Sequence, residues 1–168
     1  PRAPFAGFAM DQPRIMGILN VTPASFSDGG RNNVPARAVA TGREMIAAGA
    51  TIIDIGGEST RPGTEPVTCN QELARVLPPI AGLMPEDAVI SIDTRHGEVM
   101  SRATAAGAGI INDVGGLRGK GALDAAAAAH VPVIIMHMRG TPETMQNDPK
   151  YGFAPVEIME FLSARVEA

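Results

Sequence analysis

Short apolar runs alternate with longer segments of helical periodicity along most of this chain. The apolar runs lie at residues 15–19, 51–55, 88–92, 109–111 and 132–136. They are rich in β-branched residues, and turn residues or polar residues close them. Runs of this kind are typical of strands that are buried on both faces of a parallel sheet. We therefore predict five strands at these positions.

The segments between the runs place apolar residues on one helical stripe. The first such stripe comprises Ala38, Val39, Gly42, Met45, Ile46 and Gly49. Thr68 and Gln71 have the spacing of a capping box, which predicts that the second helix begins there. Further helices are expected at residues 97–106, 122–129 and from about residue 155 onward. Strands that alternate with helices predict a parallel α/β sheet.

An internal repeat supports this alternation. The sequence AGATIIDIGG at residues 48–57 returns as AGAGIINDVGG at residues 106–116, with one residue inserted. Two strands are thus entered and left in the same way, as a fold built from repeated βα units predicts.

Composition narrows the class of protein. The 168 residues are 45% hydrophobic and 19% charged, which is typical of one ordinary globular domain and of neither a disordered nor a membrane-spanning chain. The net charge is −4 and the basic residues are scattered, so no nucleic-acid partner is expected. One cysteine and the absence of a signal-peptide pattern favour the cytoplasm.

Polar residues close successive predicted strands. They are Asn20, Asp93, Asn112, Asp113 and His137, with Asp54 just inside its own strand. The carboxyl ends of parallel strands share one edge, where ligands bind both in barrels and in open sheets. Because an acid buried in an apolar strand needs a partner, Asp54 has either a structural partner or a ligand. The sequence therefore predicts a ligand site at this edge.

Simpler interpretations apply to some of these residues. Asp113 is expected to cap the turn that follows it, and His96 is expected to be a solvated surface residue. His137 is a weak candidate for a metal ligand, because the chain has no HxH or HExxH spacing and no second histidine at a strand end. The polar, glycine-rich stretch at residues 21–33 is longer than a minimal βα turn, which favours a functional loop.

Several motifs together resemble one known family. They are GILNVTPASFSDGG at residues 17–30, IIDIGGESTRPG at 52–63, ISIDT at 90–94, IINDV at 110–114 and IIMHMRGTPETMQ at 134–146. In order and spacing these motifs are similar to the dihydropteroate synthases of the pterin-binding superfamily. The resemblance implies a (β/α)8 TIM barrel, of which this chain supplies about five βα units, and a pterin-binding domain over residues 1–168.

The resemblance also implies a reaction and its substrates. In the family, 7,8-dihydropterin-6-ylmethyl diphosphate and para-aminobenzoate give 7,8-dihydropteroate and diphosphate, with Mg²⁺ assisting departure of the diphosphate. By this resemblance the catalytic residues are Asp93, Asn112 and Arg61. Asp93 and Asn112 meet the pterin ring, Arg61 acts with Thr60 near the diphosphate, and Asn20 is the metal ligand. A homodimer is expected for the complete protein.

The remaining site residues follow from the same motifs. Asp54 is expected to organise the floor of the pterin site. The residues that correspond to the lining of the pterin slot are Val114, Ile134 and Met136. Those that correspond to the apolar walls around the aminobenzoate ring are Phe26 and Pro62, and Asp28 corresponds to a charged residue of the first loop.

The chain departs from the family pattern in two respects. Ala24 stands where the family usually has an aspartate, so the first loop lacks one carboxylate. The family's last three units, with their own Asp, Lys, Arg and His, have no counterpart in these 168 residues, so we expect this portion alone to be inactive. A methyltetrahydrofolate-dependent methyltransferase and a non-catalytic pterin-binding fragment are the alternatives.

Overall fold

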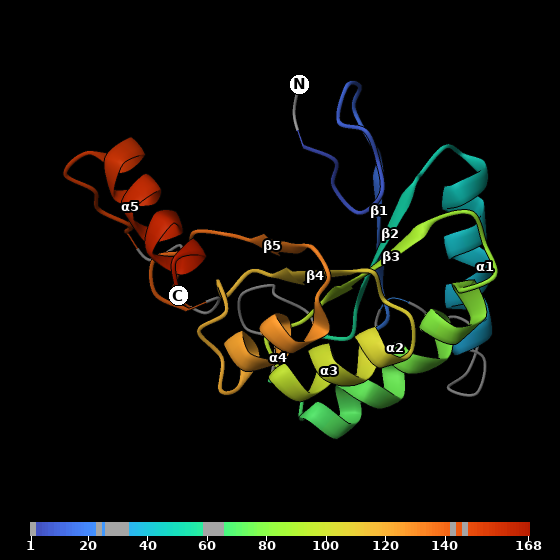
Figure 1. The fold of residues 1–168 in the computed structure, drawn as a ribbon. Helices are drawn as coiled ribbons and strands as arrows, with labels where there is room; N and C mark the ends of the chain where they lie inside the picture. The colour runs from blue at the N-terminus through green and yellow to red at the C-terminus, as the bar shows by residue number, and fades with distance from the viewer. Residues whose placement is uncertain (1–2, 23–24, 26–33, 59–65, 142–143, 146–147) are drawn as a thin grey trace.

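Five parallel strands form one sheet in chain order (Figure 1). The computed structural model describes residues 3–22, 25, 34–58, 66–141, 144–145 and 148–168. The strands are β1 (Met16–Asn20), β2 (Ile52–Gly56), β3 (Val89–Asp93), β4 (Ile110–Asp113) and β5 (Val133–Ile135). All four pairings are parallel. The five predicted strands are thus confirmed, with small shifts at their ends.

One helix follows each of the five strands. They are α1 (Val34–Ala47), α2 (Cys69–Leu83), α3 (Gly97–Ala105), α4 (Ala122–Ala129) and α5 (Ala154–Val166). Figure 1 shows α1 to α4 against one face of the sheet, whereas α5 stands apart beyond β5. The predicted capping box is present, since Thr68 and Gln71 exchange hydrogen bonds at the start of α2. No helix in the described part of the chain is long and apolar enough to cross a membrane.

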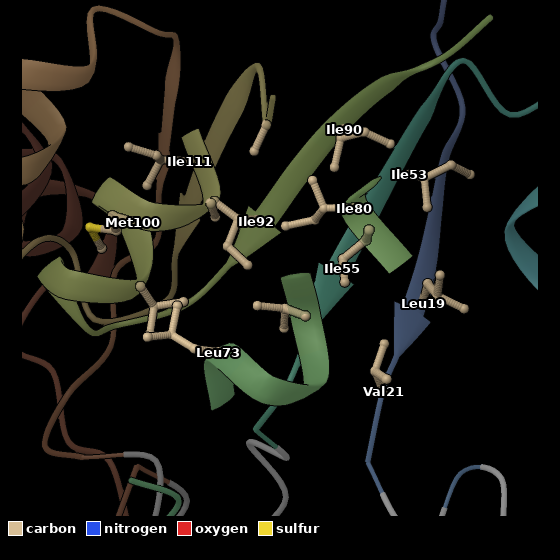
Figure 2. Close-up of a cluster of buried hydrophobic side chains, with 14 of the residues drawn as sticks. Leu19, Val21, Ile53, Ile55, Leu73, Ile80, Ile90, Ile92, Met100 and Ile111 are labelled. Atoms are coloured by element: carbon tan, nitrogen blue, oxygen red, sulfur yellow. The ribbon is translucent and has the colours of Figure 1, made fainter. Parts of the chain in front are cut away.

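The hydrophobic core lies between the sheet and these four helices (Figure 2). Because side chains alternate along a strand, every second residue points toward the helices. On β1 to β4 these are Leu19, Ile53, Ile55, Ile90, Ile92 and Ile111, and they pack with helix residues that include Leu73, Ile80 and Met100. Each fully buried side chain of this size contributes about 1.5–3 kcal/mol. This face therefore supplies most of the stability.

The opposite face of the sheet carries a different set of residues. Strand register aligns Ile18, Asp54, Ser91 and Ile110 in one row across β1 to β4. The next row toward the carboxyl edge comprises Asn20, Gly56, Asp93, Asn112 and Ile134. The register thus places Asn20, Asp93 and Asn112 on the face that α1 to α4 leave open, whereas Asp113 alternates to the other face.

Candidate active site

The second row brings four of the predicted site residues together. A Cβ added to Gly56 would lie 3.4 Å from Asp93 Oδ2 and 3.5 Å from Asn20 Oδ1, so both side chains flank this glycine. On the other side of Asp93, Asn112 is its register partner. Gly56 is itself buried, and a larger residue there would crowd both side chains.

Asn112 has a defined orientation because Asp54 holds its amide. Asn112 Nδ2 donates to Asp54 Oδ2 at 2.9 Å. The amide nitrogen therefore points back into the sheet, which leaves the Asn112 carbonyl oxygen as the free acceptor of the side chain. Asp54 thus has a structural partner in Asn112, which is one of the two alternatives that the sequence left open.

Two polar atoms on this face are buried without a hydrogen-bond partner among the described residues. They are Asp54 Oδ1 and Ser91 Oγ, on residues that are 2% and 0% exposed. A buried polar atom without a partner costs free energy, so such atoms mark places that a water or a ligand fills. Burial raises the pKa of Asp54, while the nearby hydroxyl of Ser91 and the hydrogen bond from Asn112 oppose that shift.

Asp93 is the acid of this row, and its pKa is strongly shifted. Burial raises its pKa to about 7, and the negative charges of Asp54, Glu72, Asp113 and Glu58 add to the effect. Near neutral pH both the protonated and the ionised forms of Asp93 are therefore populated. A ligand that presents N–H donors or positive charge would favour its ionised form.

Asp113 shapes the turn beside this row. Its carboxylate accepts from the backbone N–H of Gly115 at 2.6 Å and of Leu117 at 2.8 Å, which confirms its predicted role as a turn cap. Val114 lies at the start of this turn and is half-buried. A Cβ on Gly116 would lie 3.4 Å from the Met136 carbonyl oxygen, so the turn packs beside the end of β5.

Two of the three histidines, His96 and His137, lie just beyond strand ends and have different surroundings. His96 Nδ1 lies 2.7 Å from Oε2 of the fully buried Glu72, so the interpretation of His96 as solvated surface is wrong. The sequence signal for this contact was Glu72, an acid that faces inward from the first turn of α2. His137 packs against Phe161 at 5.0 Å and Tyr151 at 5.8 Å between ring centroids, two residues beyond the end of β5.

Five predicted site residues lie outside the described part of the chain: Phe26, Asp28, Thr60, Arg61 and Pro62. Ala24 lies outside it as well. Among the described residues, no group of three or more His, Cys, Asp or Glu side chains is arranged to hold a metal ion.

Known proteins are similar to this chain in sequence and in fold. The sequence profile of the family described as "Pterin binding enzyme" matches residues 16–168. The chain belongs to the pterin-binding enzyme family.

Relatives within the pterin-binding family carry a more specific name. Dihydropteroate synthase of Escherichia coli K12 is 48% identical over 158 residues, which are 94% of this chain and 56% of the relative. A solved Xanthomonas albilineans dihydropteroate synthase with 4-aminobenzoic acid superposes with a TM-score of 0.87 at 48% identity, covering 96% of this chain and 58% of that one. A Burkholderia cenocepacia dihydropteroate synthase complexed with 7,8-dihydropteroate gives 0.81 at 44% identity, covering 94% and 53%.

The chain thus spans a little over half the length of the relatives that it matches. Its five strands and five helices are five βα units of their (β/α)8 barrel, as the sequence predicted. The face that bears Asp54, Asp93 and Asn112 is the one that a closed barrel turns inward.

One pair in this pterin-binding chain was not predicted from the sequence. Glu58 and Arg95 form a bidentate salt bridge directly beyond β2 and β3. Gly56 and Asp93 are register partners, and Glu58 and Arg95 each lie two residues beyond them. The sequence signal for this pair was therefore an acid and a base at the same number of residues beyond two neighbouring strands.

Proposed function

We propose that the protein is a dihydropteroate synthase, which joins 7,8-dihydropterin-6-ylmethyl diphosphate to para-aminobenzoate and releases diphosphate. The observation that carries this proposal is the open face of the sheet. There Asp93 ionises near neutral pH, Asn112 is held by Asp54, and two buried polar atoms make no hydrogen bond to any described residue. The names of the relatives and of the compounds bound in their solved structures support the same activity.

Asp93 and Asn112 suit a pterin ring because the ring edge presents N–H donors beside acceptors. The ionised Asp93 carboxylate accepts from N–H donors, and the free carbonyl oxygen of Asn112 accepts one more. Asp54 Oδ1 and Ser91 Oγ lie one row deeper, so they can bind the part of the ring that penetrates furthest.

The reaction itself exchanges one bond for another. The C–O bond between the pterin methylene carbon and the diphosphate breaks, and the electron pair leaves with the diphosphate. The aniline nitrogen of aminobenzoate then forms a C–N bond to the same carbon and loses a proton to solvent. Positive charge develops on the pterin methylene as diphosphate departs, and a nearby carboxylate such as Asp93 stabilises that charge.

Mg²⁺ belongs to the same proposal, with Asn20 as its protein ligand. The exposed Asn20 side chain ends β1 beside Gly56 and Asp93, and its amide oxygen is a hard, neutral donor. One such donor fits a Mg²⁺ that is held chiefly by diphosphate oxygens and water. When bound, the ion would neutralise charge on the departing diphosphate.

A homodimer and a cytoplasmic location complete the proposal. The single cysteine supports the location, and the resemblance to the family supports the dimer.

The direct test is turnover by the full-length protein with both substrates and Mg²⁺. We expect dihydropteroate and diphosphate to form in equal amounts, measured by chromatography and by a coupled phosphate assay. Chelation of the metal should weaken binding of the pterin diphosphate and leave binding of the pterin without diphosphate unchanged. If the protein binds pterin but forms no dihydropteroate, the synthase proposal is wrong and a non-catalytic pterin-binding role replaces it.

A further inference from the structure

Glu72 is a buried acid that the proposed reaction does not use. It lies in the first turn of α2 and is fully buried. Its Oε2 forms a hydrogen bond of 2.7 Å with His96 Nδ1, while its Oε1 makes no hydrogen bond to any described residue. A buried acid with one partner adds little to stability, because the cost of desolvation offsets the attraction. What the pair holds in place is therefore more informative than its contribution to stability.

His96 occupies the N-cap position of α3 without capping the helix. Its side chain makes no capping hydrogen bond there, although Ser, Thr, Asp and Asn are the residues that usually serve at this position. The imidazole binds Glu72 of α2 instead. Glu72 in turn rests against the chain just beyond β2, since a Cβ on Gly57 would lie 2.9 Å from Glu72 Cγ. The contact thus joins α2 to the start of α3.

Two further hydrogen bonds connect this contact with the row that carries Asp93 and Asn112. His96 donates its backbone N–H to Thr94 Oγ1 at 3.2 Å. Thr94 donates its own backbone N–H to the Asn112 carbonyl oxygen at 3.0 Å. Thr94 directly follows Asp93 and is itself buried. The path that begins at Glu72 therefore passes beside Asp93 and ends at the backbone of Asn112.

The other side of the turn between β3 and α3 packs against the start of α4. A Cβ on Gly97 would clash with the carbonyl oxygen of Gly121, and a Cβ on Gly119 would clash with that of Arg95. Backbone contact thus blocks the turn on this side and leaves the side of α2 as the direction in which it can shift. The bond between His96 and α2 limits that shift.

We propose that Glu72 and His96 are a positioning pair for the pterin-binding residues. The pair fixes the turn after β3, and this turn joins Asp93 to the backbone of Asn112 through Thr94. The role rests on the proposed function, because binding of the ring by Asp93 and Asn112 is part of that proposal. Glu72 belongs to a helix on the covered face of the sheet (Figure 1), so it acts through the turn and does not touch the ring.

The first test is Glu72→Met in the full-length protein. Methionine has a similar volume and leaves no buried charge, so we expect the melting temperature to hold or rise. The Kd of 7,8-dihydropterin should nevertheless rise by about five- to tenfold, as for the weakening of one hydrogen bond, measured by calorimetric titration. A pair that only stabilises the fold would not lower affinity in a protein of undiminished stability.

Charge and geometry act on this result in opposite directions. Burial and neighbouring negative charges, that of Glu72 among them, raise the pKa of Asp93. Removal of the Glu72 charge alone would favour the ionised Asp93 and so strengthen binding of N–H donors on the ring. Glu72→Gln removes the charge but keeps hydrogen-bonding atoms for His96. Its Kd should therefore stay near the wild-type value or below it, in contrast to that of Glu72→Met.

The matched control is Leu83→Met. Leu83 is also fully buried on α2, but it is the last residue of the helix and packs against Gly42 of α1. A change from leucine to methionine conserves volume, so the Kd should not change. Backbone hydrogen exchange at Thr94, whose N–H binds Asn112, should be faster in Glu72→Met than in the wild type or in this control.

His96→Ser tests the pair from its other member, and it serves alone if Glu72→Met does not fold. Serine suits the N-cap of α3 and is too short to reach Glu72, so the helix keeps a cap while the contact is lost. We expect the same rise in the Kd of dihydropterin. The double variant should bind no more weakly than either single variant, because either substitution already breaks the contact.

The outcomes separate the possible failures. An unchanged Kd in Glu72→Met or His96→Ser would overturn the positioning role, whatever happens to the melting temperature. An equal loss of affinity in Glu72→Gln and Glu72→Met would also overturn it, since the charge of Glu72 would then be responsible. If the wild type binds no dihydropterin, the proposed function fails instead. Exchange at Thr94 then decides the positioning by itself, because faster exchange in Glu72→Met supports it and unchanged exchange refutes it.

Discussion

Asp93 is expected to limit the stability of the protein while it supports the reaction. Its pKa in the folded state is about 7 and its ordinary value is 3.8, so ionisation favours the unfolded chain. The resulting loss of folding stability is absent below about pH 4, grows as pH rises, and reaches its full size above about pH 7. Asp93→Asn should therefore raise the melting temperature at pH 8 and leave it nearly unchanged at pH 4, as measured by thermal unfolding at both values.

The same substitution should damage turnover. Loss of one preorganised charged group typically lowers kcat by about 10²–10³-fold, and we expect that range for Asp93→Asn with both substrates saturating. Asp87→Asn is the matched control, because Asp87 is exposed and precedes β3 at the other edge of the sheet. Near-normal turnover in the Asp93 variant would exclude the assigned role.

Affinity for the pterin should depend on pH through the same group. The ionised carboxylate accepts hydrogen bonds from the ring, and the protonated acid loses part of that capacity. Binding of 7,8-dihydropterin should therefore weaken as pH falls below about 7, the pKa of Asp93 in the free protein. Calorimetric titrations from pH 5.5 to 8.5 would show this slope in the wild type, and its persistence in Asp93→Asn would assign it to another group.

At the scale of elements, α5 differs from the other helices because none of its residues is buried. It is connected to the end of β4 by Arg165, which donates to the carbonyl oxygens of Gly116 at 2.7 Å and Leu117 at 3.2 Å. Asp113 binds N–H groups of that same turn. The turn that follows Val114 is thus held from two sides by side-chain contacts.

Arg165→Met should remove the hydrogen bonds that hold this turn from the side of α5. We expect faster hydrogen exchange at residues 114–117 and in α5, with a small change in melting temperature, because local contacts open without global unfolding. Arg102→Met is the control, since Arg102 is an exposed arginine in the last turn of α3. Equal exchange in both variants would mean that packing of Phe161 against His137, rather than Arg165, holds the helix in place.

The sequence predicted elements better than it predicted contacts between them. Periodicity depends on neighbours along the chain, so it located all five strands and the capping box at Thr68. His96 was misjudged because its partner, Glu72, lies on another element and meets it only after the chain folds. Glu58 and Arg95 were missed for the same reason, although the strand register would have aligned them. The orientation of Asn112 likewise depends on Asp54 from a strand that is not its direct neighbour.

At the scale of the whole molecule, the sheet separates stability from function by its two faces. Ser91 and Ile92 are successive residues of β3 and both are fully buried, but they point in opposite directions. Ile92 packs in the core with the helices. Ser91 lies in the row of Asp54 on the open face, and its hydroxyl has no partner among the described residues.

Substitution of these two neighbours should therefore have opposite consequences. Ile92→Ala should lower the free energy of unfolding by about 2–5 kcal/mol through the cavity that it leaves, while the Kd of 7,8-dihydropterin for the folded protein stays unchanged. Ser91→Ala removes a buried hydroxyl that lies near Asp54 but makes no hydrogen bond among the described residues, so stability should change little. If the ring uses that hydroxyl, dihydropterin affinity should fall by about two- to tenfold, and the ligand-induced rise in melting temperature should shrink accordingly. Denaturant unfolding and calorimetric titration of both variants would check this, and a Ser91→Ala protein as unstable as Ile92→Ala would show that the open face contributes to folding as much as the helix-covered face does.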